Sequence, residues 1–475
     1  MGVDNIDTIK FIIWKFMVEQ GLEHSAFSFF HEANVSHSKI LDGDDNCPRD
    51  ALIMLLNHSS ELLNYSDEED EEPEENHLIK KARYLHGLES LTRTRDVGKA
   101  RHREPFFKPS SQFPSNSILL MNGHSTEGVS CAWHPTEDCI LSTSGGFIYG
   151  QDSTVRIWNL NTQAERWTSA EQILKDSPVF CKKDTPVSCA SWCTKTQDKH
   201  IFAMGTDSGE VGLYQRDFRN ISSTNVDGSV KLLTWSPETA EGPDYLGCAT
   251  FEGDIVIFDC TDRLNGLKQP VKKLKKSGFI REMYFLSHDT GKIIVDDDKV
   301  LYLYSLKSDE PVRKFFGHRD MILSHTPAPK YNLFSSSALD GTVRIWTPDQ
   351  SIAKQTHQLS GSALFSRWSP NSETIIAQSD DLVVTHFDIP TGKRLKEILY
   401  CPGTDAEFSH NGNMFAVGCD EGMVYVWDSR SYEMVRVQKR DDDHTRLVEL
   451  HWSHDDKKIA AMYEDGGVRL FDMRV

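Results

Sequence analysis

The chain has 475 residues, of which 38% are hydrophobic, 10% aromatic and 26% charged, and its formal net charge at pH 7 is −19. This length exceeds that of a usual single domain, and the apolar content is sufficient for a large packed core. The acidic balance argues against extended nucleic-acid binding, because neutralising phosphates requires a basic surface. A basic peptide is a better-matched partner for such a chain.

Membrane insertion, secretion and a disulfide framework are not expected. No stretch approaches 18 uncharged apolar residues, so we expect no membrane-spanning segment. The N-terminus lacks the pattern of a signal peptide, and Ile6 does not fit a myristoylation site. The ten cysteines are scattered and form no C-x-x-C pair, which indicates a reducing compartment, the cytosol or nucleus.

Residues 1–66 are predicted to form a small helical module. Apolar residues recur at helical spacing from Ile9 to Met17, with Asp7 placed to cap this helix and Gly21 to end it. Helices this short cannot bury such stripes alone, so we expect a symmetric oligomer in which copies bury them together. The oligomerisation residues predicted for this module are Ile9, Ile13, Phe16, Met17, Gly21, Ala26 and Phe29.

Residues 67–116 are predicted to form a charged linker. Residues 67–75 read DEEDEEPEE, with eight acids and no base, and like charges in such a run repel and remain solvated. A basic block follows over residues 80–108. This block has two interpretations, a nuclear localisation or anion-binding patch and a solvated tether whose bases offset the neighbouring acids.

Residues 117–475 contain a repeated unit. Short β-rich runs end in an aromatic residue eight times, at intervals mostly in the low forties: Trp158, Tyr214, Phe258, Tyr304, Trp346, Phe387, Trp427 and Phe471. Each unit has an alternating run, a strand of small residues, a turn rich in Asp and Gly, and then the aromatic strand. This order predicts an antiparallel meander, and its repetition predicts a β-propeller of eight blades. We expect residues 117–122 to pair with the last blade and close the ring.

These units resemble WD repeats. The fullest copies are the first, with Gly123, His124, Asp152 and Trp158, and the fifth, with Gly317, His318, Asp340 and Trp346; Trp427 marks the seventh. The resemblance implies that His, Ser or Thr, Asp and Trp form a hydrogen-bonded set inside a blade, so these histidines are structural. The fourth unit is the weakest, because residues 296–298 are three aspartates in place of an Asp/Gly turn.

Residues 1–66 resemble the LisH motif, a dimerising helical hairpin, and residues 48–57 are similar to the helix that follows LisH in transducin-beta-like subunits of histone deacetylase co-repressor complexes. Those proteins, including the fungal member of the Set3 complex, combine LisH, this helix, a charged linker and an eight-unit WD propeller. The expected fold is thus an all-β propeller preceded by a small all-α LisH domain.

No motif for catalysis, a metal or a cofactor was found. Phosphate-loop, nucleophile-elbow and kinase motifs are absent from the sequence. His31, Glu32 and His37 have the wrong spacing for a helical zinc motif, and Cys189 and Cys193 are interpreted as small apolar core residues. We therefore expect no enzyme, no cofactor and no metal.

The resemblance implies a nuclear, non-catalytic scaffold of a deacetylase co-repressor complex that represses transcription. Its expected partners are a second copy through LisH, as a dimer or tetramer, a co-repressor protein and deacetylase subunits, and histone tails. No direct contact with nucleic acid or membrane is expected. In two alternatives the protein is still a scaffold but belongs to a different complex. It is then either a microtubule-motor regulator of the Lis type or a ubiquitin-ligase subunit of the LisH-CTLH-WD type.

Overall fold

The computed structural model describes twelve stretches of three or more residues and two single positions. They are residues 112–114, 117–124, 128–144, 154–160, 173, 177, 179–181, 187–194, 200–237, 243–275, 280–399, 403–419, 422–438 and 445–474, with some further side chains in these ranges left undescribed. The predicted LisH module and almost all of the charged linker lie outside these residues. Among the residues described, no helix has the length and apolar character needed to cross a membrane.

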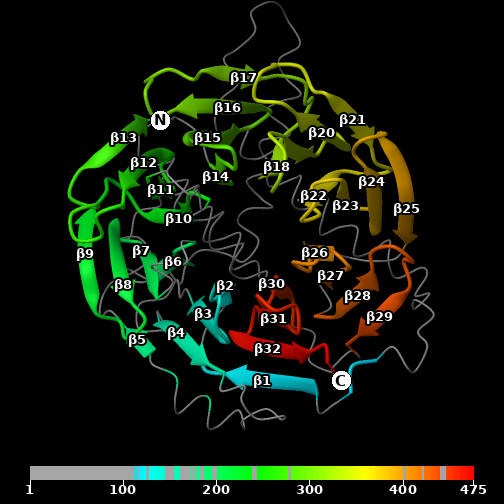
Figure 1. Cartoon of the computed structure of the whole chain (residues 1–475), viewed down its shortest axis with the longest axis horizontal. Helices are drawn as coiled ribbons and strands as arrows, with labels where there is room; N and C mark the ends of the chain where they lie inside the picture. The colour runs from blue at the N-terminus through cyan, green and yellow to red at the C-terminus, as the bar shows by residue number, and fades with distance from the viewer. Residues whose placement is uncertain are drawn as a thin grey trace, which may run out of the picture. The chain divides into compact units, whose positions relative to one another are not determined.

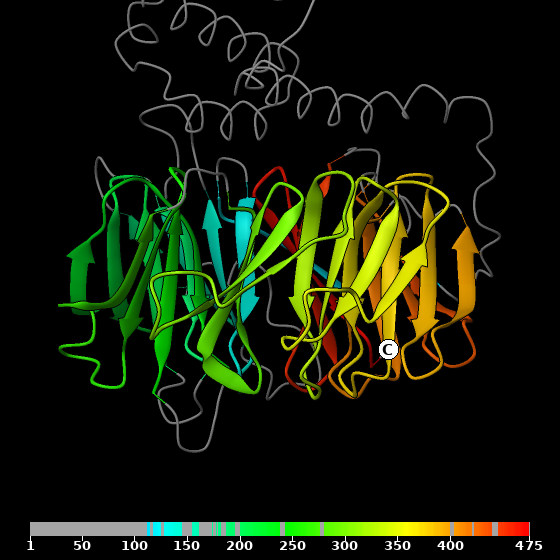
Figure 2. The same cartoon turned by 90° about the horizontal axis from the view of Figure 1, so that it is seen from above.

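The described chain forms eight four-stranded antiparallel sheets arranged in a ring (Figures 1 and 2). The first four blades contain β2 (Gly128–Trp133), β3 (Cys139–Ser144), β4 (Thr154–Asn159) and β5 (Val179–Cys181); β6 (Val187–Trp192), β7 (Ile201–Thr206), β8 (Glu210–Gln215) and β9 (Asn220–Asn225); β10 (Val230–Trp235), β11 (Tyr245–Thr250), β12 (Asp254–Asp259) and β13 (Pro270–Lys275); and β14 (Met283–Leu286), β15 (Asp289–Asp297), β16 (Val300–Ser305) and β17 (Arg313–Phe315).

The remaining blades follow the same order from the centre of the ring outwards. They contain β18 (Ile322–Pro327), β19 (Phe334–Ala338), β20 (Thr342–Trp346) and β21 (Gln355–Gln358); β22 (Ala363–Trp368), β23 (Thr374–Ser379), β24 (Val383–Asp388) and β25 (Lys393–Leu399); β26 (Gly403–Phe408), β27 (Met414–Cys419), β28 (Val424–Asp428) and β29 (Met434–Val437); and β30 (Leu447–Trp452), β31 (Lys458–Tyr463), β32 (Gly467–Asp472) and β1 (Ile118–Asn122).

The eighth blade takes its outermost strand from the start of the propeller. β1 pairs antiparallel with β32, from Ile118 opposite Phe471 to Asn122 opposite Gly467. A strand earlier in the chain thus satisfies the outer edge that β32 would otherwise leave open. The contacts also extend four residues upstream of the predicted boundary at 117, because the Phe113 N–H donates to the Val437 carbonyl at 2.9 Å.

The eight-bladed count predicted from the aromatic strand ends is confirmed. The fourth unit, which has the weakest sequence pattern, forms the complete sheet β14–β17. The first aspartate of its turn stabilises the start of the same blade, because the Asp296 carboxylate accepts the backbone N–H groups of Arg281 and Glu282. The anchor aromatics lie in the core between blades, and Trp158, Trp346 and Phe471 have no exposed surface.

In five blades, the turn before the aromatic strand contains a glycine with a positive φ. This glycine lies five residues before the aromatic anchor in all five blades, for example Gly341 with φ of +77°. In the sixth blade this position is Leu382, with φ of +67°. A side chain with a Cβ is strained in this region by about 1–2 kcal/mol.

We therefore expect Leu382→Gly to raise the free energy of unfolding by about 0.5–1 kcal/mol, because relief of strain exceeds the added entropy of the unfolded chain. Thermal or urea unfolding measures the change. The matched control is Gly341→Ala, which should destabilise the protein, because the added Cβ would lie 2.8 Å from Gln358 Nε2 and 2.9 Å from the Gly361 carbonyl oxygen. A destabilised Leu382→Gly variant would contradict the argument.

Candidate functional site: the wall of the central channel

Two blades contain the hydrogen-bonded set that the WD resemblance implies. In the fifth blade, His318 Nε2 lies 2.7 Å from Ser336 Oγ, and Trp346 Nε1 donates to the same oxygen at 2.8 Å. His318 Nδ1 lies 3.1 Å from Asp340 Oδ2. Burial raises the pKa of Asp340, but hydrogen bonds from His318, Thr342 and backbone N–H groups outweigh it and hold this pKa well below its ordinary value.

The first blade repeats this arrangement with His124. Its Nε2 lies 2.7 Å from Ser142 Oγ, which also accepts the Trp158 indole N–H at 2.7 Å. Its Nδ1 lies 3.1 Å from Thr154 Oγ1. Asp152 lies outside the described residues. Each histidine is buried and saturated by partners within its own blade, so neither is available to a ligand.

The remaining predicted residues separate into two groups. Trp427 lies in β28, is 4% exposed and stacks on Phe415 with ring centroids 5.4 Å apart. Cys193 belongs to the apolar core between the second and third blades, and Cys189 packs against that core. The predicted oligomerisation residues lie outside the part of the chain that the structure describes: Ile9, Ile13, Phe16, Met17, Gly21, Ala26 and Phe29.

A second set of tryptophans joins neighbouring blades. The inner strand of five blades ends in a tryptophan whose indole N–H donates to a backbone carbonyl of the preceding inner strand, at 2.9–3.3 Å: Trp133 to His451, Trp192 to Ala132, Trp235 to Ser191, Trp368 to Thr326 and Trp452 to Glu407. The first of these bonds joins the last blade to the first. The inner strands are thereby held in a fixed register around the axis.

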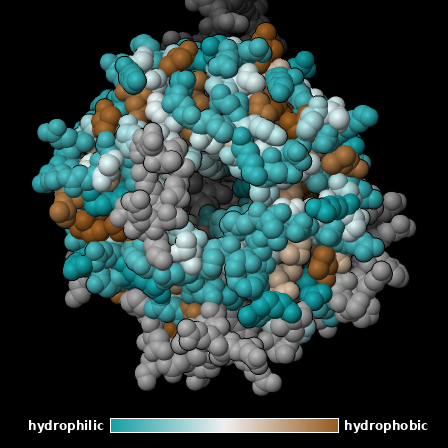
Figure 3. All heavy atoms as spheres, viewed as in Figure 1, coloured by the Kyte–Doolittle hydropathy of each residue, from teal (hydrophilic) through white to brown (hydrophobic). Residues whose placement is uncertain are grey.

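The inner strands surround a central hollow, which Figure 3 shows with hydrophilic residues along much of its described rim. We define the channel positions as the residues one and three places before the last aromatic of the inner strand, as with His451 and Glu449 before Trp452. In the first three blades these positions hold no charged residue. In the fourth, sixth, seventh and eighth blades they hold four carboxylates and two basic side chains: Glu282, Asp405, Glu407, Glu449, Arg367 and His451.

Each channel carboxylate accepts a backbone N–H from the inner strand of the next blade. Asp405 accepts from Leu450 at 3.1 Å, Glu407 from Trp452 at 2.6 Å and Glu449 from Cys131 at 3.0 Å. Glu282 accepts from His325 in the same way. A charged acceptor on an unpaired strand edge makes a strong hydrogen bond, so these carboxylates both tie blades together and make the channel wall acidic.

Arg367 joins the sixth blade to the seventh, where no tryptophan is present at the end of β26. Its Nη2 lies 2.9 Å from Asp405 Oδ1, and its Nη1 donates to Ser324 Oγ at 3.3 Å. Burial opposes the charge of Arg367, but the carboxylates of Asp405 and Glu282 outweigh it and raise the pKa of the guanidinium. Of the other three channel carboxylates, Glu407 and Glu449 lie on either side of His451.

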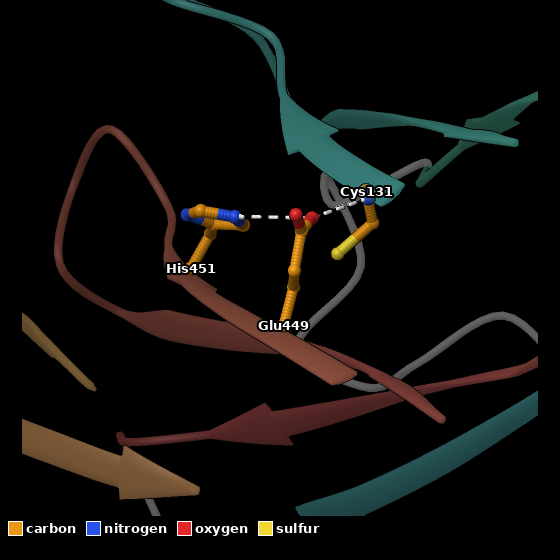
Figure 4. A group of neighbouring side chains, drawn as sticks. All are labelled: Cys131, Glu449 and His451. Carbon is orange, nitrogen blue, oxygen red and sulfur yellow. Dashed lines mark hydrogen bonds and ion pairs between the residues drawn. The ribbon is translucent and has the colours of Figure 1, made fainter. Parts of the chain in front are cut away.

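His451 lies between these two carboxylates. Its Nδ1 is 3.6 Å from Glu407 Oε1. Its Nε2 is 3.7 Å from Glu449 Oε2, and Figure 4 shows this second contact. Burial lowers the pKa of His451, but the charges and hydrogen bonds of Glu407 and Glu449 outweigh it and raise this pKa well above its ordinary value. Burial likewise raises the pKa of Glu449, whereas the contact with His451 brings it below its usual range.

The channel residues were not identified from the sequence. A signal for them exists, because charged residues alternate with apolar ones just before the aromatic in D-A-E-F (405–408) and E-L-H-W (449–452). One face of such a strand is polar although the strand lies at the centre of the ring. Which blade supplies each neighbour cannot be obtained from one repeat alone, because Cys131 and Glu449 are 318 residues apart.

The chain is an eight-bladed β-propeller with WD repeats. The family model for "WD domain, G-beta repeat" matches residues 115–159, 309–347 and 404–428. These ranges contain the first, fifth and seventh aromatic anchors, and two of them contain the hydrogen-bonded Ser–Trp pairs of the first and fifth blades.

Among characterised proteins, the chain is similar to F-box-like/WD repeat-containing proteins of the TBL1 type. It is 22% identical to TBL1Y of Homo sapiens over 385 residues, which cover 66% of this chain and 68% of that protein. It is 23% identical to TBL1X of Macaca fascicularis over 379 residues, covering 66% and 62%. It is also 26% identical to Pre-mRNA-processing factor 19 of Bos taurus over 146 residues, covering 30% and 29%.

Solved structures support the architecture. The C-terminal WD40 domain of Sif2 matches with a TM-score of 0.62 and 16% identity, covering 77% of this chain and 99% of that domain. The computationally designed Ika8 protein matches with a TM-score of 0.57 and 16% identity, covering 75% and 100%. At this identity the similarity establishes the fold alone.

Proposed function

We propose that this protein is a non-catalytic scaffold subunit of a nuclear histone deacetylase co-repressor complex and acts in transcriptional repression. The observation that carries the proposal is the similarity to TBL1-type proteins over 385 residues, together with the LisH-like pattern of residues 1–66. The propeller supplies a rigid ring whose loops and channel present surfaces to partners.

The chemistry of the described thiols supports a scaffold role. Burial raises the pKa of Cys139, Cys189 and Cys260 to about 12 in each case. The nucleophile in cysteine catalysis is the thiolate. At neutral pH these three side chains are therefore protonated, and they act as small apolar residues of the core.

Affinity purification of the full-length protein followed by mass spectrometry tests the proposal. We expect co-purification of a histone deacetylase and a SANT-type co-repressor. Recovery of dynein-associated proteins instead favours the Lis-type alternative, and recovery of ligase subunits favours the LisH-CTLH-WD alternative. Either result overturns the co-repressor assignment but leaves the scaffold role intact.

Oligomerisation through residues 1–66 is the second part of the proposal. Phe16→Asp or Ala26→Asp in the full-length chain would place an unpaired carboxylate in the predicted seam, which is costly to bury. Light scattering should show a dimer or tetramer for the unaltered protein and a monomer for each variant. A multimer that survives both substitutions would place the interface elsewhere.

Basic histone tails are the proposed peptide ligands of the propeller. The supporting observation is the acidic channel wall, where the side chains of Glu282, Glu407 and Glu449 are partly exposed. Binding of a fluorescent tail peptide should weaken as salt rises, because the attraction is electrostatic. Glu282→Gln should weaken binding of the tail peptide, while the glutamine side-chain oxygen still accepts the backbone N–H of His325. Unchanged affinity would move the tail site away from the channel.

A further inference from the structure

A thiol, a carboxylate and an imidazole meet where the last blade joins the first (Figure 4). Cys131 comes from β2, whereas Glu449 and His451 come from β30, and one donor atom from each lies within 4.8 Å of the other two. In a tetrahedral zinc site with bonds of about 2.0–2.3 Å, donor atoms lie about 3.5 Å apart. Small side-chain rotations therefore convert this cluster into a three-ligand metal site.

The orientation of His451 fits such a site. Its Nδ1 faces Glu407 Oε1 at 3.6 Å, while its Nε2 faces Glu449 at 3.7 Å. When an ion displaces the Nε2 proton, the ring keeps its Nδ1–H towards Glu407 and presents the Nε2 lone pair to Glu449 and Cys131. Metal-binding histidines commonly have a carboxylate on the other ring nitrogen, which fixes the tautomer and the ring orientation. Glu407 is the positioning residue in this arrangement.

The local charge and access also suit a divalent cation. Two carboxylates, Glu407 and Glu449, flank one imidazole, and the Arg367 guanidinium of the channel wall is already paired with Asp405. The side chains of Glu449 and His451 are each 34% exposed. An ion can therefore enter from the channel and keep a water molecule in its fourth position.

We propose that Cys131 Sγ, a Glu449 carboxylate oxygen and His451 Nε2 bind one Zn²⁺ ion at the wall of the central channel. Burial and the neighbouring carboxylates raise the pKa of the Cys131 thiol, so metal binding must release its proton. The resulting thiolate, carboxylate and imidazole ligands are those that Zn²⁺ prefers. Because the ligands come from the first and the last blade, the bound ion links the two ends of the ring. This proposal does not depend on the proposed co-repressor function.

The same chemical criteria reject two similar clusters among the described residues. In the group of His134, Glu137 and His200, His134 Nδ1 accepts the backbone N–H groups of Thr136 at 3.2 Å and Glu137 at 3.1 Å. The His134 proton therefore lies on Nε2, and neither ring nitrogen offers a lone pair to an ion.

In the group of Asp138, His454 and Asp455, lysines already supply positive charge. Lys458 Nζ lies 2.7 Å from Asp138 Oδ1, and Lys457 Nζ lies 3.0 Å from Asp455 Oδ2. A divalent cation would have to displace both ammonium groups. Among the described residues, the ion pairs of Glu407 and Glu449 are made with His451 and involve no lysine.

Metal titration of the full-length protein tests the proposal. The protein is stripped with a chelator and titrated with Co²⁺, which replaces Zn²⁺ in such sites and shows a thiolate-to-metal absorption band. We expect this band in the unaltered protein and its loss in Cys131→Ser. Elemental analysis after Zn²⁺ loading should show one equivalent less per chain in Cys131→Ser and in His451→Gln. Glu407→Gln should retain the stoichiometry and lower the affinity about 10- to 100-fold.

The matched control is Cys139→Ser, because Cys139 is a fully buried cysteine on the neighbouring strand β3. It should retain both the band and the metal content. Glu449→Gln is a second variant that keeps an acceptor for the Cys131 N–H, and thermal melts in chelator verify that each variant folds. The same spectrum in the unaltered protein and Cys131→Ser overturns the proposal, as does unchanged metal content in folded Glu449→Gln and His451→Gln.

Discussion

Replacing Asp138 by alanine is expected to lower the free energy of unfolding by about 3–5 kcal/mol, because it removes the partner of a buried ammonium group. Lys458 lies in β31 of the last blade, and its side chain is 1% exposed. Its Nζ makes a 2.7 Å ion pair with Asp138, which lies in the turn between β2 and β3 of the first blade. The pair therefore spans the junction at which the ring closes, and urea unfolding measures its loss.

A double-mutant cycle separates the ion pair from the remaining contacts of the two residues. Lys458→Met keeps the volume of the aliphatic stem, and in combination with Asp138→Ala it leaves no unpaired charge from the pair. We expect the double variant to recover most of the stability lost in Asp138→Ala, because exchanging both partners of a buried pair for apolar groups is often neutral. Strict additivity of the two single changes would show that the ion pair contributes no coupling energy.

The eight-bladed architecture was largely predictable from the sequence, because the same pattern of strand and turn residues recurs in eight units. Eight aromatic anchors and their Asp/Gly turns predicted eight blades, and even the fourth unit, with its three aspartates, forms a four-stranded sheet. Its turn differs chemically from the others, but β15 and β16 retain their buried apolar residues. Burial of apolar strand residues therefore decides the fold of this blade more strongly than its turn residues do.

The channel site was not predictable in the same way. Its residues depart from the repeat, because charged side chains at the channel positions occur in only four of the eight blades. Their partners belong to the neighbouring blade, as with Glu449 and the Cys131 N–H. Contacts between the first and last blades join residues more than 300 positions apart, and spacing within a repeat contains no information about them.

One departure from the repeat has a predictable cost. The residue just before the aromatic anchor is a buried aliphatic residue in seven blades: Ile157, Leu213, Ile257, Leu303, Ile345, Val426 and Leu470. In the sixth blade it is His386, which is 3% exposed. Neither ring nitrogen of His386 has a hydrogen-bond partner, and its ring contacts Phe408, Phe415 and Tyr432. A buried polar group without a partner costs about 1–3 kcal/mol.

His386→Ile is therefore expected to raise the free energy of unfolding at pH 7 by about 1–3 kcal/mol. This increase in the free energy of unfolding should be larger at acidic pH. Burial lowers the pKa of His386 to about 4, and the charge of Asp388 offsets this only in part. Since the imidazole titrates near pH 6.5 in the unfolded chain, the unfolded state binds more protons between these two values. The contribution of the neutral His386 to the free energy of unfolding is thus fully present above pH 6.5 and is lost as the pH falls towards 4.

At pH 5 this titration adds about 2 kcal/mol to the advantage of His386→Ile over the unaltered protein. Urea unfolding of both proteins at pH 7 and pH 5 measures the two differences, and their contrast removes effects of the isoleucine that do not depend on pH. Ile376→Val provides the control, because Ile376 is buried opposite His386 and the change removes no titratable group, so its effect should be the same at both pH values. An equal difference at both pH values would show that His386 is protonated as easily in the folded protein as in the unfolded chain.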